Sequence, residues 1–247
     1  MGHRCKSAAI DRRRKVPRDD NDRHNSDERW LAAQLPFIRR HLPPAPARVL
    51  EIGCGPLGGF VPGLLADAYD VVGVDPEAPD GPSYHRVELE QYDVQQPLDA
   101  IVACTSLHHV VDLDDVLDRV GDALVPGGTL VVVEWAHERF DEATARWCFD
   151  RLAPPDHGGN WLHRRRDGWQ ASGQSWDSYI QAWVDDEGLH HGDTIVQALR
   201  ARFATSLSVR TPYFFADLDN VTEAAEQAAI DSDRIRPTGI RYVGRRS

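Results

Sequence analysis

VLEIGCGPLGGF, residues Val49–Phe60, is the stretch that decides the fold. An apolar run with Glu51 near its end predicts a buried strand, and the glycines after it predict a sharp turn into a helix. Glycine adopts positive φ without strain and lets the backbone approach a ligand, while the next helix begins with unpaired N–H groups. We therefore expect a nucleotide-like ligand to lie against this turn. The spacing Gly53-x-Gly55-x-x-Gly58 also fits a dinucleotide fingerprint, so the turn alone leaves the cofactor open.

The composition narrows the class of protein. The chain has 247 residues, of which 41% are hydrophobic and 27% are charged, as expected for one domain with a proper core. No apolar run approaches the roughly 20 residues that cross a bilayer, and the charged start has no apolar signal region, so we expect a cytoplasmic protein. The four cysteines show neither a CxxC pair nor regular spacing. They predict reduced thiols, with no disulfide framework or zinc site.

The charge distribution weighs against general nucleic-acid binding. The net charge is −11, whereas such binding depends largely on Lys and Arg. Basic residues do cluster at the start, and we predict a disordered basic tail over residues 1–25, with a nucleic-acid arm as the alternative. Both lysines of the chain, Lys6 and Lys15, lie in that tail. Lysine chemistry in the folded core is therefore excluded.

Strands and helices alternate over the first half of the chain. We expect strands over residues 48–52, 71–74, 87–89, 100–104 and 129–133, with two late strands at 206–215 and 240–243. We expect helices over residues 30–42, 59–67, 113–124, 141–152, 176–184, 193–203 and 224–230, with Asp112 and Ser175 as caps. Residues 153–175 read as a long loop or insertion. This order predicts an α/β fold with a parallel sheet that binds ligands at the carboxyl ends of its strands.

Four segments carry a resemblance to a known family: VLEIGCG, VVGVDPE, DAIVACTSLHH and VPGGTLVVVEW. In order and spacing they resemble the successive motifs of the class I S-adenosylmethionine-dependent methyltransferases, over about residues 30–135 and the closing strands. The resemblance implies an enzyme that uses S-adenosyl-L-methionine. It also implies a Rossmann-like, seven-stranded, mostly parallel sheet with helices on both faces and an antiparallel last strand. The N-terminal helix and an insertion after the fifth strand would complete a single domain over residues 26–247, with residues 153–191 covering the substrate.

The resemblance further implies which residues contact the cofactor. Glu51 would help hold the methionine end, the glycine turn would lie against the cofactor, and Asp75 would accept hydrogen bonds from the ribose hydroxyls. Glu90, with Gln91 beside it, or alternatively Asp93, would contact the adenine amino group. The full predicted set comprises Glu51, Gly53, Gly55, Gly58, Asp75, Pro76, Glu90, Gln91 and Cys104. Asp75 would serve the ribose of NAD equally well.

Candidate catalytic residues follow the fourth and fifth predicted strands. Methyl transfer from a sulfonium is a displacement, for which the protein mainly positions the substrate and excludes water. His109 is a candidate general base because a histidine titrates near neutral pH, although it would equally serve to cap a helix or line the pocket. Glu134 would orient a substrate amine or hydroxyl, or else form a cap.

Aromatic residues supply the candidate substrate contacts. Trp135 ends the fifth strand, and Trp161 and Trp169 lie in the predicted loop, where rings suit an aromatic or anionic small molecule. Trp176 and Trp183, by their helical spacing, are expected to be core residues of a helix. No other ligands stand at metal spacing from His190 and His191, so we predict no metal site.

Several functions fit these observations, and one fits best. We expect methyl transfer from S-adenosylmethionine to an oxygen or nitrogen of a small molecule. The alternatives are an NAD(P)-dependent oxidoreductase, an RNA methyltransferase that uses the basic tail, and a binding module without activity. Glu51, the turn Pro126-Gly127-Gly128 and the absence of a core lysine count against the oxidoreductase. The motifs for methylating exocyclic amines, protein glutamine or cytosine C5 are absent, so nucleic-acid and protein substrates are disfavoured.

Overall fold

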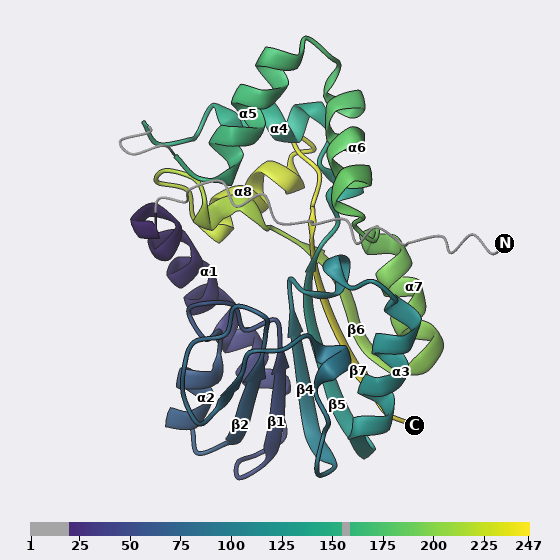
Figure 1. Ribbon diagram of the computed structural model, residues 1–247. Helices are drawn as coiled ribbons and strands as arrows, with labels where there is room; N and C mark the ends of the chain where they lie inside the picture. The colour runs from purple at the N-terminus through teal and green to yellow at the C-terminus, as the bar shows by residue number, and fades with distance from the viewer. Residues whose placement is uncertain (1–19, 155–158) are drawn as a thin grey trace, which may run out of the picture.

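A seven-stranded sheet in the order β3-β2-β1-β4-β5-β7-β6 forms the centre of the protein (Figure 1). The structure is a computed structural model that describes residues 20–154 and 159–247, and of residues 20–25 only the backbone. The strands are β1 (Arg48–Ile52), β2 (Asp70–Val74), β3 (Tyr84–His85), β4 (Leu98–Cys104), β5 (Leu124–Trp135), β6 (Ala204–Thr211) and β7 (Gly239–Arg245). Strands β1 to β5 run parallel, and β7 is antiparallel to both of its neighbours. The predicted mostly parallel sheet is confirmed.

Helices cover both faces of this sheet, as the continuous apolar strands require. The helices are α1 (Asp20–His41), α2 (Val61–Ala66), α3 (Leu113–Ala123), α4 (Glu142–Phe149), α5 (Trp161–Ser172), α6 (Trp176–Glu187), α7 (Gly192–Arg202) and α8 (Glu223–Asp231). Side chains alternate between the faces along β5: Val131 and Val133 pack with α1 and α2, whereas Leu130 and Val132 pack with α3 and α7. Two separate apolar layers therefore hold the sheet.

A third apolar cluster lies beyond the carboxyl ends of β4 and β5, where helices α4, α5, α6 and α8 gather at the top of Figure 1. It is rich in aromatic residues, and its centre is Trp176, which is fully buried and donates its Nε1–H to the carbonyl of Phe140. A single-turn 3-10 helix, η4 (Phe214–Ala216), completes this cluster. The helices of this third cluster lie over one end of the sheet, and we call them the cover.

Several expected elements differ from the observed ones. The third strand is Tyr84–His85 rather than 87–89, because Leu89 turns into a buried 3-10 helix, η1 (Leu89–Gln91). The last-but-one strand ends at Thr211, since Pro212 lacks an N–H to continue the ladder. The segment 153–175 contains helix α5, which Asn160 starts by accepting from the N–H groups of Leu162 and His163.

The N-terminal helix is longer than expected. It begins at Asp20 and so overlaps the last part of the predicted tail, of which residues 1–19 lie outside the described residues. In the described part of the chain no helix is both long enough and apolar enough to span a membrane. The predicted caps Asp112 and Ser175 are confirmed, because each accepts a hydrogen bond from the backbone N–H three residues later.

Candidate active site

The glycine turn after β1 is built around the side chain of Glu51. This carboxyl group is fully buried, and the N–H of Phe60 donates to its two oxygens at 2.8 and 3.0 Å. Gly59 has φ +58°, and a Cβ there would lie 2.1 Å from Oε1 of Glu51. Burial raises the pKa of Glu51 to about 8. Glu51 therefore holds the turn closed from inside while it also lines the neighbouring cavity.

A cavity of about 480 Å³ opens over the carboxyl ends of β1, β4 and β5. Strand order reverses between β1 and β4, so this is the switch point at which sheets of this type bind ligands. The turn after β1 lines one side, Cys104 and Thr105 follow from β4, and the other side is formed by aromatic residues of the cover. Its volume falls within the range of small-molecule sites, about 300–1,000 Å³.

Backbone strain marks the exit of β4 into this cavity. Thr105 has φ +46°, a left-handed conformation that is unfavourable for a β-branched residue, and its N–H donates to the carbonyl of Val133 at 2.8 Å. Strain of this kind persists where the surroundings fix the residue, and it is concentrated at functional sites. The turn directs η2 (Leu107–His109), with its two histidines, over the sheet.

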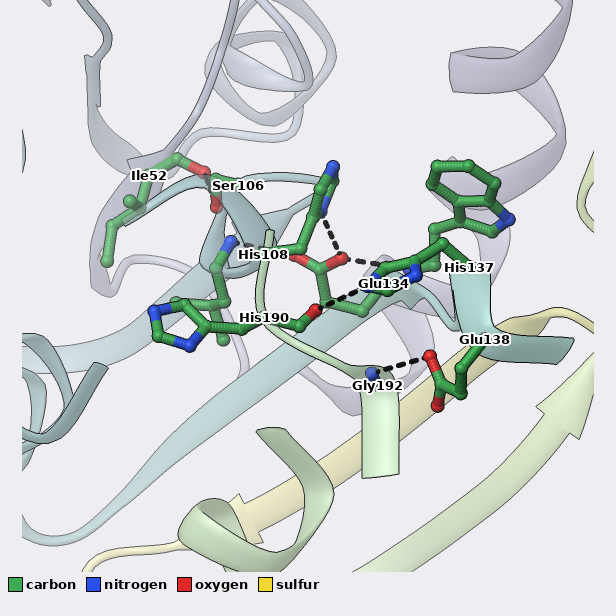
Figure 2. A network of polar contacts seen from close by, with 10 residues as sticks. Ile52, Ser106, His108, Glu134, His137, Glu138, His190 and Gly192 are labelled. Atoms are coloured by element: carbon green, nitrogen blue, oxygen red, sulfur yellow. Dashed lines mark hydrogen bonds and ion pairs between the residues drawn. The ribbon is translucent and has the colours of Figure 1, made fainter. Parts of the chain in front are cut away.

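Glu134, near the end of β5, holds the β4 exit in place. Its carboxylate is completely buried and accepts from the N–H of Leu107 at 2.7 Å and from the N–H of Trp135 at 2.8 Å. Its Oε2 also lies 2.7 Å from Nδ1 of His108 (Figure 2). Burial alone would raise the pKa of Glu134, but His108 and the backbone donors outweigh burial and lower this pKa. Glu134 is therefore an ionised residue that orders η2 from below.

His109 lies beside His108, with their ring centroids 4.1 Å apart. Its side chain is open to the cavity, yet protein atoms surround it. Burial, with a smaller contribution from the neighbouring His108, lowers the pKa of His109 to about 4. At neutral pH the ring is uncharged and binds a proton weakly.

Five aromatic residues wall the cavity on the side of the cover: Trp30, Trp135, Trp161, Trp183 and Tyr213. Trp135 stacks on Tyr213 with ring centroids 5.7 Å apart and an interplanar angle of 12°. Trp161 donates its Nε1–H to Asp217 at 3.0 Å. The Nε1–H of Trp135 is buried and has no hydrogen-bond partner among the described residues.

The structure places half of the predicted site residues in the lining of the cavity. Those that line the cavity are Glu51, Gly53, Gly55, Cys104, His109, Trp135 and Trp161. Glu134 is fully buried and does not line the cavity, and its backbone contacts agree with the second of its two expected roles, that of a cap. Trp169 also lies outside, because its ring packs on Phe149 and Trp176 within the cover and its Nε1–H donates to the carbonyl of Gln174.

The remaining predicted cofactor residues do not line the cavity. Gly58 packs against Tyr84, whose Oη would lie 2.4 Å from an added Cβ. Asp75 and Pro76 follow β2 beside the turn, and the side chain of Asp75 accepts from the N–H of Glu77 at 2.6 Å. Glu90 and Gln91 lie in η1, and the shortened β3 places Glu88 nearer to the end of that strand. Their cofactor contacts stay predictions.

Sequence reasoning missed several residues of the aromatic wall. Trp183 has the helical spacing of a core residue, and this spacing gives no sign that Trp183 also lines a cavity. Tyr213 and Asp217 flank η4, and the segment up to Phe215 was expected to be strand. Trp30 comes from the opposite end of the chain. Only the packing of the cover on the sheet brings these residues together. In the described part of the chain, no group of three or more His, Cys, Asp or Glu residues is placed to hold a metal ion.

Comparison with known proteins gives the family. Residues 23–174, more than half of the chain, match the family model described as a methyltransferase domain. This chain belongs to the class I S-adenosylmethionine-dependent methyltransferases. S-adenosylmethionine is the cofactor of this family, as the resemblance of the four segments implied.

Named relatives of this methyltransferase align over part of its length. A ubiquinone biosynthesis O-methyltransferase of Bradyrhizobium sp. (strain ORS 278) is 31% identical over 103 residues, covering 34% of this chain and 38% of the relative. A trans-aconitate 2-methyltransferase of Variovorax paradoxus (strain S110) is 34% identical over 123 residues, covering 44% of this chain and 46% of the relative. The chain thus spans less than half the length of the curated relatives it matches.

Solved structures agree with the fold of the methyltransferase. An S-adenosylmethionine-dependent methyltransferase from Mesorhizobium loti superimposes with a TM-score of 0.52 at 22% identity, covering 87% of this chain and 98% of that one. A geranyl diphosphate C-methyltransferase from Streptomyces coelicolor A3(2) gives a TM-score of 0.51 at 15% identity, covering 87% of this chain and 76% of that one. At these identities the likeness concerns the fold.

The residues present fit the family cofactor. Gly55 lines the cavity with φ +61°, and a Cβ added there would meet no protein atom within 4 Å. A glycine with open space before it leaves room for a ligand to approach the backbone. Glu51 and Cys104 lie on the same side of the cavity, and the aromatic wall faces them from the cover.

Proposed function

We propose that this methyltransferase transfers a methyl group from S-adenosylmethionine to an oxygen or nitrogen of a small molecule. The observation that carries the proposal is one cavity lined both by the glycine turn and by five aromatic residues. The turn would hold the methyl donor, and the aromatic wall would hold the acceptor. A volume of about 480 Å³ suits a small molecule better than a polymer.

The residues of this chain would act mainly by positioning and by excluding water. The cofactor, when bound, supplies an electrophilic methyl group on sulfur. Gly53, Gly55 and Glu51 would bind it at the turn. Trp135, stacked on Tyr213, would present a flat apolar surface to the acceptor molecule. Holding both molecules in reacting orientation is the larger part of catalysis for a displacement of this kind.

The relatives are consistent with a small acceptor molecule. Two of them are an O-methyltransferase of ubiquinone biosynthesis and a trans-aconitate 2-methyltransferase. The structure offers little to a nucleic acid, because the cavity is lined by acidic residues such as Glu187 as well as by Arg165. We therefore favour a small molecule over RNA as the acceptor.

Thermal unfolding in the presence of candidate ligands tests the cofactor part of the proposal. We expect S-adenosylmethionine and S-adenosylhomocysteine to stabilise the protein by about 2.7 kcal/mol at a hundred times their Kd. NAD and NADP should leave the melting temperature unchanged. Stabilisation by the nicotinamide nucleotides alone would contradict the proposal. Transfer of radiolabelled methyl from S-adenosylmethionine to small molecules, set against transfer to RNA, tests the acceptor class.

A further inference from the structure

The contacts of His108 fix both its ring and its tautomer. The two backbone N–H groups on Glu134 can only donate, and the lowered pKa of this carboxyl group keeps it ionised, so it accepts from all three neighbours. Nδ1 of His108, 2.7 Å away, therefore carries the proton of that hydrogen bond. In a neutral imidazole the other nitrogen, Nε2, is then an acceptor.

The acceptor nitrogen of His108 lies on the side of the ring that points away from Glu134. His108 is one of the residues that line the cavity, and Figure 2 shows the ring extending away from Glu134 with its second nitrogen at the far end. Among the described residues none forms a hydrogen bond with Nε2. The carbonyl of His108 accepts from the N–H of His190 at 3.0 Å, which fixes the backbone of η2 as well.

We propose that His108 is the catalytic base of this enzyme, that Glu134 is its positioning residue, and that the methyl acceptor is a phenolic hydroxyl. This inference rests on the proposed function. The hydroxyl oxygen forms a bond to the methyl carbon while the carbon–sulfur bond breaks and its electron pair stays on sulfur. The hydroxyl proton moves to Nε2 of His108. The products are a methyl ether, the thioether form of the cofactor and a protonated His108.

The charge arrangement suits this step. Buried Glu134 stabilises the imidazolium that forms on His108, as a carboxylate does for a histidine base in other enzymes. The titratable groups that face His108 are Glu134, His109 and, from η3 (His137–Arg139), His137. His109 is the weaker candidate base, since its pKa of about 4 leaves little affinity for a proton.

The surroundings select an aromatic acceptor that carries a proton. A carboxylate or a neutral amine attacks through a free lone pair, so a buried carboxylate and histidine pair would add little to its reaction. A phenol, with a pKa of about 10, attacks poorly until its proton is accepted. The rings of Trp135, Trp161 and Tyr213 suit a flat aromatic molecule.

Two phenols of different acidity test this inference on the full chain. Phenol needs a base at neutral pH, whereas 4-nitrophenol is largely ionised above neutral pH without one. We expect the wild type to methylate both at pH 8. In His108→Asn, kcat for phenol should fall by about 10²-fold or more, while kcat for 4-nitrophenol stays within about threefold. Glu134→Gln should lower kcat for phenol by about tenfold or more, with KM unchanged.

The controls separate a base from a structural residue. His41→Asn, at the far end of α1, should leave the rates with both phenols unchanged. His108→Asn should keep the wild-type affinity for S-adenosylhomocysteine and the wild-type melting temperature. For phenol the wild type should lose kcat/KM as the pH falls, and His108→Asn should lose this acid limb.

Three results would overturn the inference and leave the proposed function standing. They are an equal loss on both phenols, no loss on either, and transfer to aniline or benzoate but to neither phenol. If S-adenosylmethionine does not bind, the proposed function itself is wrong, and the inference falls with it.

Discussion

Gly55 and Gly127 both have a left-handed backbone conformation, but only one of them lines the cavity. Gly55 in the turn after β1 has φ +61° and Gly127 at the start of β5 has φ +76°, and a Cβ at either would meet no protein atom within 4 Å. The difference is that Gly55 lines the cavity and Gly127 does not. A substitution at these positions therefore separates the effect of backbone strain from the effect of filling the proposed cofactor site.

We predict that Gly55→Ala and Gly127→Ala destabilise the protein similarly, by about 1–2 kcal/mol each, because both place a Cβ in a left-handed backbone. Only Gly55→Ala should weaken S-adenosylhomocysteine binding, by about tenfold or more, or about 1.4 kcal/mol. Urea unfolding gives the first quantity and isothermal titration the second. Equal affinities in the two variants would place the cofactor away from Gly55.

At the scale of single elements, the short helix η4 depends on one side chain from α8. Glu226 is fully buried and accepts from three successive backbone N–H groups, those of Tyr213, Phe214 and Phe215, at 2.8, 3.2 and 2.6 Å. Tyr213 in turn stacks on Trp135 at the cavity wall. The position of this wall therefore follows from a carboxyl group that does not touch the cavity.

We expect Glu226→Ala to lower the free energy of unfolding by roughly 3 kcal/mol or more, since it leaves buried donors unpaired. The matched control is Glu142→Ala, whose side chain is 47% exposed and pairs with Arg146 one helical turn away. That change should cost less than about 0.5 kcal/mol. Urea unfolding measures both, and similar losses in the two variants would show that Glu226 does not hold η4.

Sequence patterns predicted the elements whose residues alternate or repeat. The run Arg48–Ile52 is a buried strand with no competing signal, and the structure has the same bounds. The amphipathic spacing of α6 also predicted that helix correctly. Helix α5 was missed because Arg, Gly and Trp obscure any apolar period there, and its start depends on the side chain of Asn160.

The candidate site was predictable where a local sequence motif carries it. Glu51, Gly53 and Gly55 follow from a single motif, and all of them line the cavity. Residues such as Trp30 and Tyr213 come from distant parts of the chain, and only tertiary packing brings them together. The role of Glu134 was ambiguous for a similar reason, because the sequence does not show that His108 lies above it.

At the scale of the whole molecule, buried carboxyl groups link stability to pH. Burial raises the pKa of Glu51 to about 8 and that of Glu226 to about 7. Each group is then protonated in the folded protein at pH values where it is ionised in the unfolded chain. The folded state therefore binds more protons, and its stability decreases as the pH rises through these values. His109 acts in the opposite direction, but only between about pH 4 and its ordinary value of 6.5.

We predict that the free energy of unfolding decreases between pH 6.5 and pH 8, by up to about 1.4 kcal/mol per pH unit for each such group. In Glu51→Gln, which cannot ionise, the decrease should be much smaller. Urea unfolding at pH 6.5, 7.25 and 8 measures both slopes. A wild-type stability that rises over this window would show that Glu51 is ionised in the folded protein.

The antiparallel strand β7 occupies an inner position, between β5 and β6, although it comes after both in the chain. As the polypeptide leaves the ribosome, β6 emerges before the strand that pairs with it. The edge of β5 stays open over the same period. Both edges have unpaired backbone groups, which favour wrong pairing or association with other chains. The sheet can close only when residues 239–245 have been synthesised, and until then these two edges are the surfaces that a chaperone would need to shield.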